Sequence, residues 1–173
     1  MIDQYWLQQF VLYAIMKQNI VRYIGQFEGI MKVCTFFGHR DASKEIETKL
    51  KSVLLDLIKN KNVTMFYVGN HGNFDYIVRG ILKELKNEYH INYYVVLAYI
   101  PSKKYDYEDY SDTIYPDELS ATPHKYRIIQ RNKWMLKKSD YVVTYVSHKM
   151  GGAAHFSQLA KSNGKVILNL DNS

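Results

Sequence analysis

Three loops of this sequence combine glycine with polar or charged side chains, which is the composition of a ligand-binding loop. They are GHRD at 38–41, GNHGNFD at 69–75 and SHKMGGAAHF at 147–156. Glycine turns the backbone sharply and lets a ligand approach the main chain closely. Each loop taken alone also has an ordinary interpretation, because glycine and polar residues are common where a strand turns into a helix. A functional interpretation therefore requires the three loops to meet.

The double glycine of the third loop opens a predicted helix. The first amides of a helix have no partner within the helix, and they lie at the positive end of its dipole. Gly151, Gly152 and Ala153 would therefore let a phosphate group approach the backbone. The loop is not a Walker loop, which needs Gly-Lys-Ser/Thr, and GNHGNF lacks the full dinucleotide-binding pattern. The pattern predicts an anion site without assigning it to either class.

A basic helix pattern at 123–138 precedes this loop. Arg127 and Arg131 are four residues apart and share a helix face. We interpret Arg127 and Lys133 as a solvated basic stripe. Arg131, with Asn132 beside it, can reach over the sheet edge, where a guanidinium suits a phosphate or carboxylate.

The elements that position these residues follow from hydrophobic patterning. Continuous apolar runs predict buried strands at 32–37, 63–68, 93–100, 140–146 and 165–170. Helical patterns alternate with them at 43–60, 74–89, 123–138 and 153–162. The predicted fold class is α/β, a Rossmann-like doubly wound parallel sheet of about five strands with helices on both faces. Right-handed crossovers would bring the three loops to one edge of the sheet.

The residues predicted to bind ligand or phosphate are those of the three loops and the basic helix. They are Gly38, His39, Arg40, Gly69, Asn70, Gly72, Asp75, Arg131, Asn132, Gly151, Gly152 and Ala153. We expect Asn73 or Asp75 to cap the helix after the second loop. The histidines lack metal spacing, and His90, His124 and His148 are interpreted as surface residues. We expect no metal and no cofactor.

Composition limits the classes of partner. A chain of 173 residues with 47% hydrophobic content buries one good core. The formal charge of +6 comes without a basic tail or arginine-rich tract, which weighs against nucleic acid as the partner. The apolar run at 10–16 is too short to span a membrane. The single cysteine, Cys34, excludes an intrachain disulfide, which is typical of cytoplasmic proteins.

The first thirty residues differ from the rest of the chain. Residues 1–30 suit an amphipathic helix, and a strand begins immediately after Met31. The codons that encode Glu28 and Gly29 resemble a bacterial ribosome-binding site ahead of Met31. This favours the hypothesis that translation begins at Met31. We expect an N-terminal helical extension at 1–30 and one domain at 31–173.

A long acidic, tyrosine-rich insertion, residues 101–123, follows the third predicted strand. Loops of this length are uncommon in compact domains and are often functional. One interpretation is a lid in which Tyr105, Tyr107 or Tyr115 stacks on a nucleobase. The alternative is a solvated loop whose aromatic rings pack on the domain's own flank.

Four motifs together resemble the YpsA/YoqJ-type branch of the SLOG superfamily, which includes the Lonely Guy phosphoribohydrolases and DprA. The motifs are FFGHRD, VGNHGNFD, RNKWM…SDYVVTYV and GGAAHF, and the resemblance runs from about Met31 to the end. It implies a Rossmann-like domain that holds a nucleotide or nucleotide-derived ligand across its strand-edge loops.

The resemblance also implies what is missing. Lonely Guy enzymes carry an R-K-x-x-M helix and a P-G-G-x-G-T-x-x-E loop, whose arginine and glutamate are tied to base release. Arg131 and Met135 match the helix, with Asn132 in place of lysine. Gly151 and Gly152 match the loop, where the other positions hold Met150, Ala154, His155 and Gln158. Because Gln158 stands where the glutamate would be, hydrolysis by that mechanism is not expected. Glu45, Asp75 and Asp140 are the carboxylates that remain to replace it.

Three functions stay open at this point, in order of preference. The first is binding or sensing of a small-molecule nucleotide. The second is a nucleotide phosphoribohydrolase-like enzyme, and the third is a DprA-like DNA-associated protein. Homo-oligomerisation through the strand at 140–146 or the helix at 123–138 also stays open.

Overall fold

The computed structural model describes residues 31–100, 112–148 and 150–171. All of these residues except Met31 belong to one compact unit, Lys32–Ser173. The predicted helical extension at 1–30 lies outside the described residues, as do 101–111 of the insertion.

Strands and helices alternate along the unit. The strands are β1 (Lys32–Gly38), β2 (Val63–Val68), β3 (Asn92–Val96), β4 (Thr113–Ile114), β5 (Tyr141–Tyr145) and β6 (Val166–Asn169). The helices are α2 (Glu47–Lys61), α3 (Asn73–Glu88), α4 (Arg127–Lys138) and α5 (Gly152–Ser162), with 3-10 turns η1 (Lys44–Ile46), η2 (Asp117–Leu119) and η3 (His124–Tyr126).

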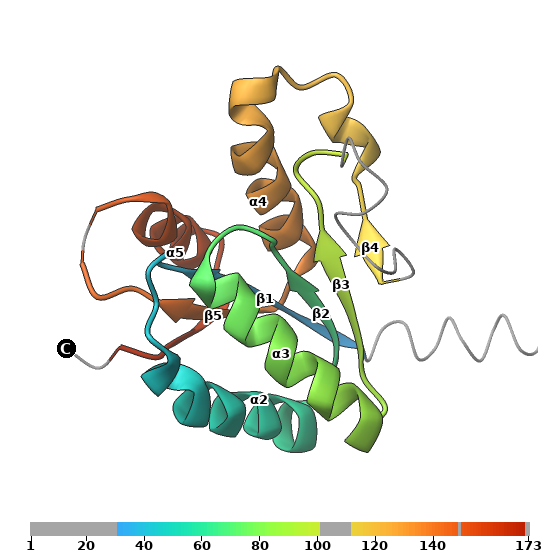
Figure 1. Ribbon diagram of the computed structural model, residues 1–173, viewed down its shortest axis with the longest axis vertical. Helices are drawn as coiled ribbons and strands as arrows, with labels where there is room; N and C mark the ends of the chain where they lie inside the picture. Colours follow the sequence, from blue (N-terminus) through green and yellow to red (C-terminus); the bar gives the residue numbers. More distant parts are fainter. Residues whose placement is uncertain (1–30, 101–111, 149, 172–173) are drawn as a thin grey trace, which may run out of the picture. The chain divides into compact units, whose positions relative to one another are not determined.

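The strands form one parallel sheet in the order β4-β3-β2-β1-β5-β6 (Figure 1). The chain builds outward from β1 through β2 and β3 to β4. It then crosses to the other side of β1 and continues with β5 and β6. The strand order therefore reverses between β1 and β5, and open sheets bind ligands outside the carboxyl ends of the strands at such a point.

Helices cover both faces of the sheet, and two neighbouring residues of β1 show how. Phe36 packs in the core beneath α2 and α3 and stacks with Phe66 at 6.2 Å between ring centroids. Phe37 points to the opposite face and stacks with Phe156 of α5 at 4.9 Å. Met135 of α4 completes this second core. The period of two along a strand thus divides one apolar run between two cores.

The predicted fold class is confirmed, with one more strand than expected. The two-residue strand Thr113–Ile114 pairs with Val95 and Val96 of β3. It was predicted as part of a loop because two residues are too few to show a period. The predicted strand at 93–100 ends at Val96, and the Leu97 amide donates to the Ile114 carbonyl at 2.8 Å.

The insertion and the start of α4 also differ from prediction. The helix predicted at 123–138 begins later, at Arg127, and Pro123 at the start of the predicted range is the N-cap of η3. Tyr115, a predicted lid residue, is half-buried and packs against the core beneath α2 and α3. Tyr105 and Tyr107 lie outside the described residues. For Tyr115 the structure favours the alternative, in which the ring packs on the domain's own flank.

Candidate functional site

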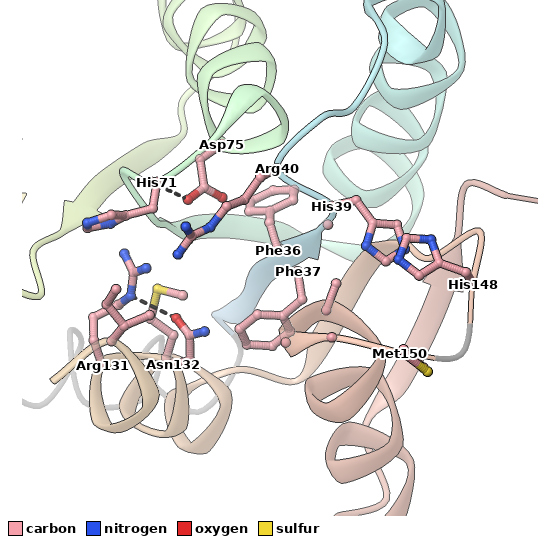
Figure 2. Close-up of a pocket in the computed structure, with 16 residues that line it drawn as sticks. Phe36, Phe37, His39, Arg40, His71, Asp75, Arg131, Asn132, His148 and Met150 are labelled. Atoms are coloured by element: carbon pink, nitrogen blue, oxygen red, sulfur yellow. Dashed lines mark hydrogen bonds between the residues drawn. The ribbon is translucent and has the colours of Figure 1, made fainter. Parts of the chain in front are cut away.

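A pocket of about 360 Å³ lies at the carboxyl ends of β1, β2 and β5. Its size falls in the range of small-molecule sites. The loops after β1, β2 and β5 and one side of α4 form its walls (Figure 2). It therefore occupies the point where the strand order reverses, which is where the sequence placed the convergence of loops.

Most of the predicted site residues line this one pocket. They are Gly38, His39, Arg40, Asp75, Arg131, Asn132, Gly151, Gly152 and Ala153. The other three, Gly69, Asn70 and Gly72, belong to the loop after β2 but are not part of the lining. Their effect on the site is indirect, through neighbouring residues that do line the pocket.

Gly69 shows this indirect role. A Cβ at Gly69 would lie 2.3 Å from Oδ2 of Asp75 and 2.7 Å from Nη1 of Arg131. Both distances are shorter than any real contact, so no side chain fits there without displacing a pocket residue. Asn70 also supports Arg131, whose Nη1 donates to Oδ1 of Asn70 at 3.5 Å. Gly72 is the N-cap of α3, where either Asn73 or Asp75 had been predicted.

The double glycine forms the opposite wall. Gly151 is the N-cap of α5 with φ of +95°, a conformation that favours glycine. The first intrahelical bond at this end runs from the His155 amide to the Gly151 carbonyl. Among the described residues, nothing lies within 4 Å of a Cβ built at Gly151 or Gly152. The amino end of α5 thus faces open space in the pocket.

Arg131 lies in the pocket wall and is only 2% exposed. Its Nη1 donates to the Val96 carbonyl at 2.8 Å, and its Nε donates to Oδ1 of Asn132 at 2.8 Å. The guanidinium therefore ties α4 to the end of β3, as well as bringing positive charge to the pocket. A residue held in this way is preorganised, which reduces the cost of ordering it around a ligand.

Arg40 is the second cation of the pocket, and it differs from Arg131 because it is exposed. It follows β1 directly, and its backbone carbonyl accepts from the Asn73 amide at 2.8 Å. Figure 2 shows its guanidinium directed into the space between Asp75 and Arg131. An exposed guanidinium can turn toward an anion without leaving a buried partner unsatisfied.

Asp75 is the only carboxylate in the lining of this pocket among the residues that the structure describes. It is 8% exposed, and its Oδ2 accepts from the His71 backbone amide at 2.9 Å. Burial raises the pKa of the Asp75 carboxyl, although Arg131 opposes the shift. Asp75 thus fixes the loop before α3 and keeps a poorly solvated acid beside two cations.

Three histidines line the pocket, of which sequence reasoning selected only His39. The His39 ring is buried, and its Nε2 accepts from the Ser147 amide at 3.2 Å. It stacks on His148 with 3.7 Å between centroids and 7° between planes. Burial and His148 lower the pKa of His39, and burial and the nearby arginines lower that of His71. Both rings are therefore neutral at pH 7.

The residues that prediction missed are His71, His148, Met150 and the apolar lining formed by Phe36, Phe37, Ile128 and Met135. His148 is exposed, as predicted, but it also belongs to the site. The sequence positions of His71 and His148 could have indicated that they belong to the site. His71 lies between the glycines of the second loop, and His148 lies just before the double glycine. Strand periodicity gives no information on which loop rings will stack.

Gln158 and the three carboxylates named as candidates to replace the missing glutamate lie in different places. Gln158 is exposed on α5 and does not line the pocket. Glu45 is exposed in η1, and Asp140 accepts from the Val33 amide at the opposite end of β1. Asp75 is the member of this set that reaches the pocket.

Within the described ranges, no helix has the length and apolar character to cross a membrane. Nor do His, Cys, Asp or Glu side chains there form a cluster of three or more that could hold a metal ion.

The fold and the pocket's position define the class of the molecule, a Rossmann-like α/β domain with a pocket at its topological switch point. Among solved structures, its fold is similar to that of DNA processing protein A (DprA) from Streptococcus pneumoniae, with a TM-score of 0.60 and 17% sequence identity. The match covers 83% of this chain and 51% of that chain, so this chain spans about half of that protein's length. At this identity the likeness shows a DprA-like fold and nothing finer. The chain matches no protein-family model and no curated protein.

Proposed function

We propose that the pocket binds a nucleotide or a nucleotide-derived ligand, as expected for the YpsA/YoqJ-type branch that the motifs resemble. The observation that carries the proposal is the convergence of three loops on one pocket, with an open helix amino end on one wall and two arginines on the other. Helix amino ends and guanidinium groups are the protein groups that most readily bind phosphate.

The two walls suggest a division of roles. The amides of Gly152 and Ala153 would receive the phosphate, because they open α5 and, among the described residues, nothing lies within 4 Å of a Cβ built at Gly152. Arg40 would move onto the phosphate from the exposed side, and buried Arg131 would add a fixed charge. The neutral histidines and the Phe37 ring offer apolar and hydrogen-bonding surface to the rest of the ligand.

Hydrolysis of the N-glycosidic bond is the enzymatic alternative. Gln158 is exposed outside the pocket, so this alternative depends on Asp75. A raised pKa would suit Asp75 to the role of general acid, but its Oδ2 already accepts from the His71 amide. Release of free base from a nucleoside monophosphate, followed by chromatography, would establish this alternative over simple binding.

The DprA-like fold is the observation that favours a DNA-associated role as a second candidate. Single-stranded DNA binding needs a cationic groove with stacking aromatic side chains, and its affinity falls steeply with salt. Titration with an oligonucleotide at low and high salt separates this candidate from nucleotide binding.

The direct test is calorimetric titration of the full chain with AMP, GMP, ADP-ribose, NAD and inorganic phosphate, each with the wild type, Arg40→Ala and Lys133→Ala. Lys133 is exposed on α4 outside the pocket, so its variant removes one positive charge at a matched but distant position. We expect binding by the wild type and by Lys133→Ala, and at least tenfold weaker binding by Arg40→Ala. An equal loss of affinity in Arg40→Ala and Lys133→Ala would show that only the overall positive charge matters. If none of the probes binds the wild type, the proposal is contradicted.

A further inference from the structure

The loop that leads to the double glycine is held by side chains from the two strands beside β5. The Val146 amide donates to Oδ1 of Asn169 at the end of β6, at 3.2 Å. The next amide, that of Ser147, donates to Nε2 of His39 after β1, at 3.2 Å. These contacts hold the backbone at Val146 and Ser147, five and four residues before Gly151, the N-cap of α5.

His39 is committed to this loop in three ways. Its backbone amide donates to the Tyr145 carbonyl at 3.2 Å, which extends the pairing of β1 with β5. His39 as a residue is 8% exposed, and its ring lies flat against His148 of the same loop, as Figure 2 shows. Its Nε2 points at a backbone donor, so that nitrogen must be the unprotonated one. A proton on Nε2 would face the Ser147 N–H and remove the bond.

We propose that neutral His39 is a positioning residue that holds the loop between β5 and α5 in its phosphate-binding conformation, so that protonation of His39 releases the loop and weakens anion binding. This inference rests on the proposed function and adds a pH dependence to it. It predicts the opposite sign to the simplest expectation, in which a protonated histidine near an anion strengthens binding.

The groups around His39 act in both directions. Burial and His148 favour the neutral ring, whereas Asp41 in its own loop and Asp171 after β6 favour the protonated one. The edge of the Tyr145 ring, 6.3 Å away between centroids, adds an apolar neighbour. The balance lowers the pKa of His39, so the contact is complete at neutral pH and is lost as the pH falls below the ordinary value of about 6.5.

Two variants separate positioning from charge. His39→Gln places an amide oxygen near the position of Nε2 and does not titrate, so it can accept from Ser147 at every pH. His39→Phe keeps a flat ring against His148 but has no acceptor. With AMP as probe, we expect wild-type affinity to fall between pH 7.5 and 5.5 by up to about fivefold more than that of His39→Gln, where fivefold corresponds to loss of one net hydrogen bond at full protonation of His39. His39→Phe should bind weakly at both values.

The titration of the AMP phosphate affects every variant alike, so the difference between wild type and His39→Gln is the quantity that matters. Inorganic sulfate, whose charge is constant over this range, serves as a second probe. The inference would be overturned if affinity depended on pH in the same way in wild type and His39→Gln. It would also be overturned if, relative to His39→Gln, wild-type binding became tighter at pH 5.5.

A readout without ligand separates failure of this inference from failure of the proposed function. Hydrogen exchange of the Ser147 amide in the free protein should be protected in wild type and His39→Gln at pH 7.5. Protection, corrected for the intrinsic rate, should fall in wild type as His39 takes up its proton, and it should be low in His39→Phe throughout. If Ser147 behaves in this way but neither AMP nor sulfate binds, the loop contact stands and the proposed function fails. Equal protection of Ser147 in wild type and folded His39→Phe, or protection in wild type that stays constant as the pH falls, overturns the positioning role.

Discussion

The two glycine-rich loops of this domain look alike in sequence and differ in what surrounds them. The glycines after β2 lie against other parts of the protein, where a Cβ at Gly69 or Gly72 would come within 3 Å of a neighbouring atom. The glycines after β5 face open space among the described residues. The first pair, Gly69 and Gly72, allows other residues to pack closely against the backbone. The second pair, Gly151 and Gly152, leaves the backbone accessible.

This difference separates structural residues of the site from residues that meet a ligand. The two arginines of the pocket differ in the same way. Arg131 is buried and donates to the Val96 carbonyl, whereas Arg40 is exposed. Residues of the first kind should affect stability when changed, and residues of the second kind should affect binding.

The largest effect is expected for Gly69→Ala. Its new methyl group would overlap the Asp75 carboxylate and the Arg131 guanidinium, both of which are buried. We expect a loss of about 3 kcal/mol in the free energy of unfolding, the upper range for overpacking a core. Urea denaturation followed by circular dichroism measures it. A variant as stable as the wild type would show that this loop is not packed as described.

Arg131→Ala should lower the free energy of unfolding nearly as much as Gly69→Ala does. It would leave the Val96 carbonyl and Oδ1 of Asn132 without this donor in a buried site, at a cost of about 2 to 3 kcal/mol. Arg40→Ala is the matched change at an exposed position. Its free energy of unfolding should lie within about 0.5 kcal/mol of the wild-type value. Thermal and urea unfolding of both variants compares them. Equal stability of the two would remove the distinction between the two arginines.

Gly152→Val should act on binding alone. Its branched side chain would enter the open space in front of α5. We expect phosphate and AMP affinity to fall about tenfold, or about 1.4 kcal/mol, while the midpoint of urea unfolding changes little. A variant that binds like the wild type would mean that the ligand does not approach these amides.

Asp75→Asn tests the buried carboxyl. Because the pKa of Asp75 is raised, the folded state holds its proton more tightly than the unfolded chain does, and stability falls as the pH rises above the ordinary value. Removing the charge should stabilise the protein at pH 7 and flatten this pH dependence. Denaturation at pH 4 and pH 7 measures the change. Asp75→Ala, which loses the acceptor of the His71 amide, should be destabilised instead.

The smallest effect is expected for Gln158→Glu. The side chain at this position is exposed on α5 outside the pocket lining, so a carboxylate there should not reach a ligand held at Gly152. Chromatography of AMP incubated with the variant should detect no free adenine. Release of adenine would show that the ligand extends along α5, and it would revive the enzymatic alternative.

The sequence predicted the fold because five strands and four helices carry long, regular apolar patterns. It missed β4, whose two residues pair only because the chain returns to β3 after the insertion. The convergence of loops also followed from topology, which brings Gly38 and Gly152 to one edge whatever the side chains do. What sequence could not supply was the direction of side chains. Nothing in the spacing distinguishes buried Arg131 from exposed Arg40, or shows that Nε2 of His39 would accept from the Ser147 amide.

The central claim is that the open amides of α5 and the facing arginines receive one anion. Titration of ¹⁵N-labelled protein with AMP, followed by amide chemical shifts, tests it most directly. The account predicts saturable shifts of the Gly152 and Ala153 amides that are weakened in Arg40→Ala and retained in Lys133→Ala. Saturable binding that leaves these two amides unmoved and shifts residues of α2 or the opposite edge of the sheet would contradict it.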